Sequence, residues 1–255
     1  MKDQARLVLP DLHIPFQNKK LLACWLRRLE DNAWDGVDII GDMIDCFNLS
    51  RFDKNPARKA NIQKEIDDAS DLLAYIRTLL GRDADIQYSE GNHEDRLRKL
   101  LWGKSRQLGD LRNLTIPELM DLNKHGVTWH SAANPYKIGD LWYTHGDVLR
   151  KHGSQSARAK SDAIKGSVIM GHCHRMGWSP YTTWETTLDG FEVGHMTDYT
   201  QLDYVQTAPN WQLGWAEVFF VNGVHIVNFI RVVKHGREDW VLGPDGLIDH
   251  YRRVR

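Results

Sequence analysis

Five short polar segments carry the residues of this chain that could bind metal ions. They are Asp11-Leu12-His13, Gly41-Asp42, Gly91-Asn92-His93-Glu94, Thr144-His145-Gly146-Asp147 and Gly171-His172-Cys173-His174. Together they offer carboxylates, imidazoles and one amide, a set that suits Zn, Fe, Mn and similar divalent ions. One Asp or His in a loop is usually only a loop residue, so the order and placement of all five segments carry the prediction.

Each polar segment follows a short apolar stretch that we expect to be a β-strand, at residues 5–10, 37–40, 85–89, 141–144 and 168–170. Ligand sites gather at the carboxyl ends of strands in α/β sheets. In an extended chain, residues two apart face the same side, so Asp11 and His13 can hold one ion. The same alternation puts His172 and His174 on one side and turns Cys173 away.

Helical spacing of apolar residues predicts helices over residues 19–31, 56–80, 94–102 and 154–165. The alternation of strands, loops and helices indicates an α/β fold. After about residue 125 the pattern changes: a short strand is expected at 127–130 and the chain beyond Gly177 favours β-structure. Segments 215–221 and 224–230 predict a hairpin, because Asn222-Gly223 suits a type I′ turn. Since we find no repeat or linker, we expect one domain over residues 1–255.

Composition excludes few functions. The 33 Lys and Arg residues balance 34 Asp and Glu residues, so a net charge of −1 indicates no global attraction to nucleic acid or membranes. The chain has neither a predicted signal peptide nor an apolar stretch of the ~20 residues that span a membrane. Three scattered cysteines fit a reducing compartment. We therefore expect a soluble cytoplasmic protein without a membrane partner, and its oligomeric state stays open.

In this order, the five segments resemble the motifs of the calcineurin-like metallophosphoesterase superfamily: DxH, GD, GNH followed by an acidic residue, a lone His, and GHxH. The resemblance implies a four-layer α/β/β/α sandwich of two mixed sheets flanked by helices, with a dinuclear metal site at its edge. It assigns Asp11, His13, Asp42 and His174 to one ion. It assigns Asp42, Asn92, His145 and His172 to the other, so that Asp42 bridges the two. Residues 210–214 also resemble part of small phosphoesterases encoded by phages and prophages.

The implied cofactors are two divalent metal ions, with Mn expected and Zn, Fe or Ni as alternatives. Two cations ~3.5–4 Å apart can clamp a phosphoryl group, and a bridging water that loses its proton can attack the phosphorus. By resemblance, His93 faces the substrate and stabilises or protonates the leaving oxygen. Asp45 would orient the ring of His93. The alternatives are a structural His93 bonded to a loop carbonyl and an Asp45 that caps a helix.

Substrate contacts are predicted around the same motifs. Arg175, next to His174, is the expected phosphate contact because a guanidinium binds phosphate through two hydrogen bonds. Asn92 and Arg96 are further predicted substrate contacts. Two basic runs, at residues 96–106 and 150–160, are either solvated surfaces or a track for a phosphate backbone. His152 and His195 are additional candidates for the substrate cleft.

The chain departs from the pattern of protein Ser/Thr phosphatases within the superfamily. Cys46-Phe47 follows Asp45 where that group has Arg-Gly, and Gly146-Asp147 follows His145 where that group has Gly-Gly. The expected function is therefore a phosphodiesterase acting on nucleotides or nucleic acid. One alternative is a phosphomonoesterase or protein phosphatase in which Arg96 or Arg175 replaces the missing arginine. The other is a metal-containing binding module without turnover.

Overall fold

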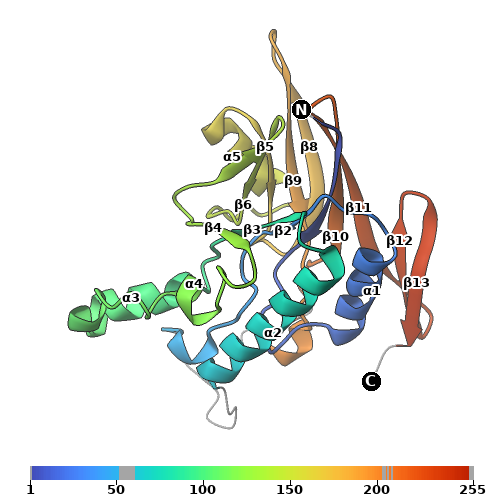
Figure 1. Ribbon diagram of the computed structural model, residues 1–255. Coiled ribbons are helices and arrows are strands. Elements are labelled where there is room, and N and C mark those ends of the chain that lie inside the picture. The colour runs from blue at the N-terminus through green and yellow to red at the C-terminus, as the bar shows by residue number, and fades with distance from the viewer. Residues whose placement is uncertain (1, 52–60, 203–204, 206, 208, 253–255) are drawn as a thin grey trace.

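The computed structural model describes residues 2–51, 61–202, 205, 207 and 209–252. Within this part of the chain, two β-sheets lie face to face, with α-helices on their outer sides (Figure 1). No helix among the described residues has the length and apolar character to cross a membrane.

The larger sheet has eight strands in the order β13-β12-β11-β10-β1-β2-β3-β4. Strands β1 to β4 are mutually parallel, and the strands from β10 to β13 join them through antiparallel pairs. The strands are β1 Gln4–Leu9, β2 Gly36–Ile39, β3 Asp85–Ser89, β4 Val127–His130, β10 Gly214–Val221, β11 Val224–His235, β12 Glu238–Gly243 and β13 Gly246–Arg252.

The smaller sheet has five strands in the order β5-β6-β7-β9-β8. Strands β6, β7 and β9 are parallel, and the antiparallel edge strands β5 and β8 complete the sheet. The β8–β9 hairpin extends beyond the body of the molecule (Figure 1). The strands are β5 Tyr136–Ile138, β6 Leu141–Thr144, β7 Ser167–Met170, β8 Met176–Thr182 and β9 Thr187–Val193.

Two of the α-helices begin at an asparagine whose side chain caps them. The Asn18 side chain accepts from the Leu21 N–H at the start of α1, and Asn61 does the same for Gln63 and Lys64 at the start of α2. The predicted helix at 56–80 corresponds to α2, and its first five residues lie outside the described residues. The α-helices are α1 Lys19–Glu30, α2 Ile62–Leu80, α3 Asp95–Lys104, α4 Ile116–Leu119 and α5 Gln155–Ile164. Short 3-10 turns occur at Phe47–Leu49, Arg106–Leu108 and Tyr199–Gln201.

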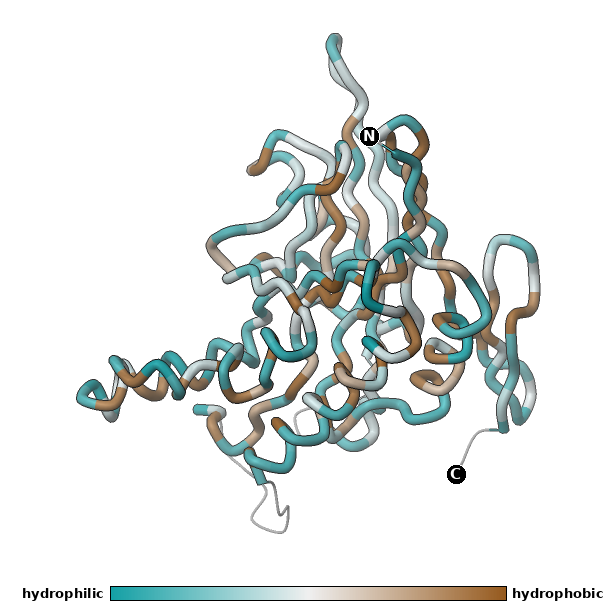
Figure 2. The backbone as a smooth tube through the Cα atoms, in the orientation of Figure 1, coloured by the Kyte–Doolittle hydropathy of each residue, from teal (hydrophilic) through white to brown (hydrophobic). Residues whose placement is uncertain are grey.

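Three groups of buried apolar residues define four layers. The first group joins one face of the larger sheet to α1 and α2, and includes Leu7, Trp25 and Ile76. The second joins the two sheets, with Val8 and Ile169 among its members. The third packs α5 against the smaller sheet. Hydrophobic segments accordingly concentrate in the interior of the molecule in Figure 2. The four-layer α/β/β/α sandwich with two mixed sheets is therefore confirmed.

The predicted C-terminal hairpin is also confirmed. Strands β10 and β11 pair from Val221 and Val224 outward, around the Asn222-Gly223 turn. Both turn residues have positive φ, 53° and 85°, as a type I′ turn requires. This hairpin places β10 beside β1 at the centre of the larger sheet, so β1 is held between β10 and β2.

Candidate metal centre

The predicted polar segments meet at one edge where the two sheets adjoin. Three of them follow β1, β2 and β3 of the larger sheet, and two follow β6 and β7 of the smaller sheet. All five therefore leave the carboxyl ends of parallel strands, as the sequence predicted. Seven side chains that were predicted as ligands come together there: Asp11, His13, Asp42, Asn92, His145, His172 and His174.

We predicted an extended backbone at these segments, and this prediction was wrong. Asp11, His13 and Asp42 have positive φ values of 24°, 51° and 50°, and His172 and His174 have values of 67° and 57°. These residues occupy the left-handed region in tight turns, which is uncommon for residues other than glycine. Strain of this kind collects at functional sites because the surrounding structure must impose it. The side chains converge because the loops turn sharply, not because a strand alternates.

One group of ligand atoms consists of Asp11, His13 and His174, whose side-chain donors lie within 4.8 Å of one another. The Nε2 atoms of His13 and His174 are 3.1 Å apart, and His174 Nε2 is 3.6 Å from Asp11 Oδ1. All three residues are buried. Two facing imidazole nitrogens and a carboxylate oxygen at such distances fit one cation between them.

A second group consists of Asp42, His145 and His172. His145 Nε2 lies 3.2 Å from both Asp42 Oδ2 and His172 Nδ1, and 3.1 Å from Asn92 Oδ1. Asp42 Oδ2 is also 3.7 Å from Nε2 of His13, which belongs to the first group. The Asp42 carboxylate thus lies between the two groups, in the position predicted for the bridging ligand.

Hydrogen bonds on the far side of two imidazole rings leave their inner nitrogens available. His145 Nδ1–H donates to the Ile40 carbonyl at 2.9 Å, and His13 Nδ1–H donates to Asp45 Oδ2 at 3.0 Å. When the ring is neutral, each Nε2 therefore directs a lone pair into the site, an arrangement that is typical of metal-binding histidines. The buried Nδ1 of His174 has no partner among the described residues. The donor set and its orientation fit two divalent cations.

Without cations, protons must balance the buried charges. Burial raises the pKa of Asp11 to about 8. Burial lowers the pKa of His145, but the adjacent Asp42 carboxylate outweighs it and raises that pKa to about 10. Burial also disfavours ionised Asp42, yet His145 holds the pKa of Asp42 well below its usual range. For His172, burial and the neighbouring His145 lower the pKa to about 4. The site is thus electrostatically unbalanced in a way that bound cations would relieve.

Comparisons with known proteins agree with this fold. No family model matches the sequence. The Gene 54 protein of Mycobacterium phage D29 is 28% identical over 246 residues, which cover 91% of this chain and 94% of the relative. The Gene 54 protein of Mycobacterium phage L5 is 28% identical over 244 residues, with the same coverage of each chain. The crystal structure of Chaetomium thermophilum Vps29 aligns with a TM-score of 0.50 and 11% identity, over 99% of this chain and 96% of that chain.

The chain has the calcineurin-like metallophosphoesterase fold. The two phage relatives also agree with the likeness to phage-encoded proteins that residues 210–214 indicated. In this metallophosphoesterase fold, the polar loops that follow parallel strands of both sheets make up the site described above.

Beside the two ligand groups lies a third cluster formed by His13, Asp45 and His93. The Asp45 carboxylate is 3.0 Å from His13 Nδ1 and 3.3 Å from His93 Nδ1, while His93 Nδ1–H donates to the Asp45 backbone carbonyl at 2.8 Å. Asp45 therefore contacts His93, as predicted, but its closer carboxylate contact is with the predicted ligand His13. The alternative of a helix cap is wrong, because the 3-10 turn after it has Cys46 at its cap position and no side-chain cap.

Arg96 approaches the site from α3. Its guanidinium donates to His93 Nε2 at 2.9 Å and to the Asp45 carbonyl at 2.7 Å. The predicted substrate contact Arg175 lies in the β7–β8 loop, where its guanidinium donates to the Arg150 carbonyl. Arg175 is half-buried, and its phosphate contact stays a prediction.

The remaining histidine candidates differ in position. His195 is fully buried and stacks on His174, with ring centroids 4.9 Å apart. Burial lowers the pKa of His195 to about 3, so this ring is neutral and packs behind a predicted ligand. Trp211 contacts both rings edge-on. His152 is exposed on the loop before α5.

The sequence did not assign a role to Glu94, the last residue of the GNHE segment. Its buried carboxylate accepts from the backbone N–H groups of Asp42, Met43 and Gly91 at 2.8–3.0 Å, and from the Tyr88 hydroxyl at 2.8 Å. Through these hydrogen bonds, Glu94 connects the loop after β2 to the loop after β3. The sequence signal for this role is the acidic residue that directly follows Asn92 and His93.

Proposed function

We propose that this protein hydrolyses phosphoesters with two divalent cations, and that its substrates are phosphodiesters of nucleotides or nucleic acid. The observation that carries the proposal is the pair of buried ligand groups that share Asp42. Asp11, His13, Asp42 and His174 would hold one cation, and Asp42, Asn92, His145 and His172 the other. Manganese is the proposed metal, and Zn, Fe or Ni are alternatives.

A bound pair of cations would polarise the phosphoryl oxygens and activate water as the nucleophile. The protein itself must position the ester and handle the leaving oxygen. His93 lies at the edge of the ligand groups, with Nε2 3.8 Å from Asp42 Oδ2. Burial lowers the pKa of His93, but Asp42 and Asp45 outweigh this effect and raise it above the usual value. Once Arg96 no longer donates to Nε2, that nitrogen can take up a proton and donate it to the leaving oxygen.

Arg96 then has a defined part in the proposal. In this structure its guanidinium occupies the Nε2 side of His93, where a substrate oxygen would have to approach. A phosphoester that binds both cations would accept hydrogen bonds from Arg96 and release His93 Nε2. The guanidinium would also stabilise negative charge on the phosphoryl oxygens as the ester bond breaks.

A phosphomonoesterase is the second candidate, and the position of Arg96 favours it. Protein Ser/Thr phosphatases carry an arginine after the acidic residue that corresponds to Asp45, and this chain has Cys46 there. Arg96 contacts the Asp45 carbonyl and could bind the terminal oxygens of a monoester from that side. Comparing hydrolysis of a diester with hydrolysis of a monoester distinguishes the phosphodiesterase from the phosphomonoesterase.

The test uses the chelated protein reloaded with Mn, Zn or Ni. Hydrolysis of bis(4-nitrophenyl) phosphate is compared with hydrolysis of 4-nitrophenyl phosphate, beside an Asp42→Asn variant. We expect diester cleavage that needs the metal and falls to background in Asp42→Asn. Monoester cleavage alone would support the phosphatase. Unchanged activity in Asp42→Asn would place the site elsewhere, and binding without turnover of any ester would support a silent binding module.

A further inference from the structure

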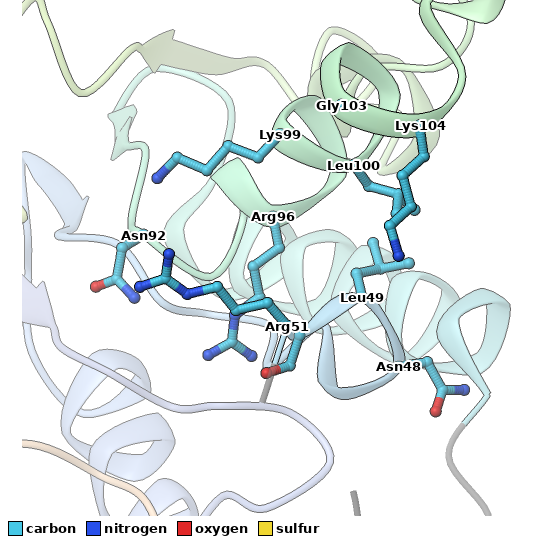
Figure 3. Close-up of a pocket in the computed structure, with 10 residues that line it drawn as sticks. Asn48, Leu49, Arg51, Asn92, Arg96, Lys99, Leu100, Gly103 and Lys104 are labelled. Carbon is cyan, nitrogen blue, oxygen red and sulfur yellow. The ribbon is translucent and has the colours of Figure 1, made fainter. Parts of the chain in front are cut away.

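A cationic pocket opens beside the metal centre. Its volume is about 670 Å³, and it is lined by Asn48, Leu49, Ser50, Arg51, Asn92, Arg96, Lys99, Leu100, Gly103 and Lys104 (Figure 3). Two of these residues are shared with the metal centre, because Asn92 contacts His145 and Arg96 contacts His93. A ligand group in the pocket would therefore lie next to an ester at the metals, and both could belong to one molecule.

The charge of the lining is one-sided. Four cationic side chains face this space and no carboxylate of the described residues lines it, although the whole chain has a net charge of −1. Lys99 pairs with Asp95 at 2.6 Å, but the Lys99 side chain is 67% exposed, so this pair is weak and open to exchange. Lys104 makes no ion pair within the described part of the chain. The pocket thus offers cations to an anionic ligand.

Helix geometry divides the basic run that the sequence singled out. Arg96, Lys99 and Lys104 are spaced by three and five residues on α3 and line this pocket. Arg98 points to another cavity, where it pairs with Glu90 and Asp95. Arg106, beyond the end of α3, lines a third space. Only part of the run can therefore contact a ligand that also reaches the metals.

The apolar residues of the lining indicate which part of a ligand would lie between its charged groups. Figure 3 shows the ends of Arg51, Arg96 and Lys99 on the Asn92 side of the pocket, with Leu49, Leu100 and Lys104 farther from Asn92. A ligand that follows this lining meets cations, then two leucines and a further cation. A nucleic-acid strand alternates phosphates with flat apolar bases and matches that order. A phosphopeptide would bring one phosphate, which the metals already bind.

We propose that this pocket holds the nucleotide next to the scissile phosphate, so that the preferred substrate is a nucleic-acid strand rather than an isolated diester. Arg96 faces the scissile phosphate, the neighbouring phosphate lies by Lys99, the base rests on Leu49 and Leu100, and Lys104 meets the next phosphate. This inference rests on the proposed function, because it takes the scissile phosphate to be at the metals. It adds the substrate class and the path of the strand beside the metal centre.

The experiment compares Lys99→Gln/Lys104→Gln with Arg106→Gln/Arg112→Gln. Both variants lose two positive charges from neighbouring segments, and all four positions are exposed. Only the first pair lines the pocket. Glutamine preserves the helix, since its propensity is close to that of lysine. The Mn-loaded proteins are assayed on bis(4-nitrophenyl) phosphate, which has no neighbouring phosphate, and on short oligothymidylates.

We expect Lys99→Gln/Lys104→Gln to raise the KM for oligothymidylates at least about tenfold while its rate on bis(4-nitrophenyl) phosphate stays that of the wild type. Between about 50 and 200 mM salt, the slope of log KM against log salt should fall by about 1.4, since each phosphate contact on a single strand contributes about 0.7. The Arg106→Gln/Arg112→Gln control should match the wild type on both substrates.

Binding of a fluorescently labelled oligothymidylate to the metal-free proteins gives a second readout. If neither ester is hydrolysed but the pocket variant alone binds the strand more weakly, the proposed function fails and the nucleic-acid pocket stands. Equal KM and equal binding for wild type and pocket variant would overturn the pocket. So would an equal loss in the Arg106 and Arg112 control, or competition by an acidic phosphopeptide as strong as that by the strand.

Discussion

At the scale of single residues, the centre depends on which nitrogen of each imidazole faces inward. Burial in a polar cluster does not by itself make a metal ligand, since a histidine whose two nitrogens both donate cannot bind a cation. His13 and His145 each use Nδ1–H on an outer acceptor, the Asp45 carboxylate and the Ile40 carbonyl. Once the ring has lost its second proton, this arrangement fixes the tautomer in which Nε2 carries the lone pair.

Asp45 can be tested through this role. Asp45→Ala removes the acceptor of His13 Nδ1, so the ring loses its fixed tautomer and orientation. We expect affinity for the first cation to fall by about 10- to 100-fold, and Asp45→Asn to lose less because its amide oxygen can still accept. Competition with a chromogenic chelator measures both. Asp147→Ala is the control, because that exposed carboxylate pairs with Lys160. Unaltered affinity in Asp45→Ala would contradict the role.

The buried charges also predict how metal binding responds to pH. In the metal-free protein, Asp11 has a pKa of about 8 and His145 one of about 10, so both are protonated at pH 7. Binding requires the ionised carboxylate and the neutral imidazole, so each group must release its proton. Affinity for metal should therefore rise with pH up to about 10, and more steeply below about 8, where both groups must release a proton. His172, with a pKa of about 4, is already neutral and adds nothing near pH 7.

Calorimetry in buffers of different ionisation enthalpy measures this proton release directly. The heat of Mn binding at pH 7 should change with the buffer, and the change should shrink as pH rises past 8. Asp11→Asn removes one of the two titrating groups, so fewer protons should be released by the cation that still binds. A heat that does not depend on the buffer would show that both groups are already in their ligand forms.

At the scale of elements, the loops after β2 and β3 act as one unit because Glu94 connects them. Its carboxylate accepts hydrogen bonds from three backbone N–H groups of these loops and from the Tyr88 hydroxyl. Close approach requires glycine: a Cβ on Gly91 would lie 2.2 Å from Asp42 Oδ1. The position of the bridging carboxylate is thus set by a neighbouring loop and not by its own segment alone.

Glu94→Gln tests this connection with little change in volume. The amide offers one oxygen, so at least one buried donor loses its acceptor, at a cost of about 1–3 kcal/mol for each. We expect a lower free energy of unfolding in urea with chelator present, together with weaker metal binding. Glu90→Gln is the comparison, since Glu90 is a buried carboxylate bonded to Arg98 and the Ala132 N–H. It should lose stability but keep its metal affinity; equal effects of both variants on affinity would refute the connection.

The elements show what could be predicted from the sequence and what could not. The strands before the motifs contain buried apolar residues, and β3, β4 and β6 match their predicted bounds. The edge strand β13 and the outer part of β8 are largely exposed and lack such a run, because pairing with a neighbour stabilises them. The left-handed turns were missed for a related reason. The motif Asp11-x-His13 shows which side chains could bind a metal ion. The backbone conformation of these residues depends on the packing around the loop, which the motif does not contain.

At the scale of the whole molecule, a buried ion network joins the two sheets away from the metal edge. Arg6 on β1 bonds Asp38 on β2 through two nitrogens at 2.7 and 2.9 Å, and Asp85 on β3 at 2.7 Å. From the smaller sheet, the Tyr136 hydroxyl donates to the same Asp38 carboxylate at 2.8 Å. The three parallel strands that precede four of the seven predicted ligands are therefore held in register by charge as well as by backbone hydrogen bonds.

Removing the cation of this network should destabilise the fold more than removing its neutral member. Arg6→Met leaves Asp38 buried without a counter-charge, which we expect to cost about 3–5 kcal/mol, and Tyr136→Phe should cost about 1 kcal/mol. Urea unfolding measures both in the presence of chelator, because bound metal would add its own stabilisation. In Arg6→Met/Asp38→Leu the buried charge is gone, so much of the loss should be recovered. If Arg6→Met alone cost no more than Tyr136→Phe, the sheets would be held by apolar packing and the network would only set which residues face one another.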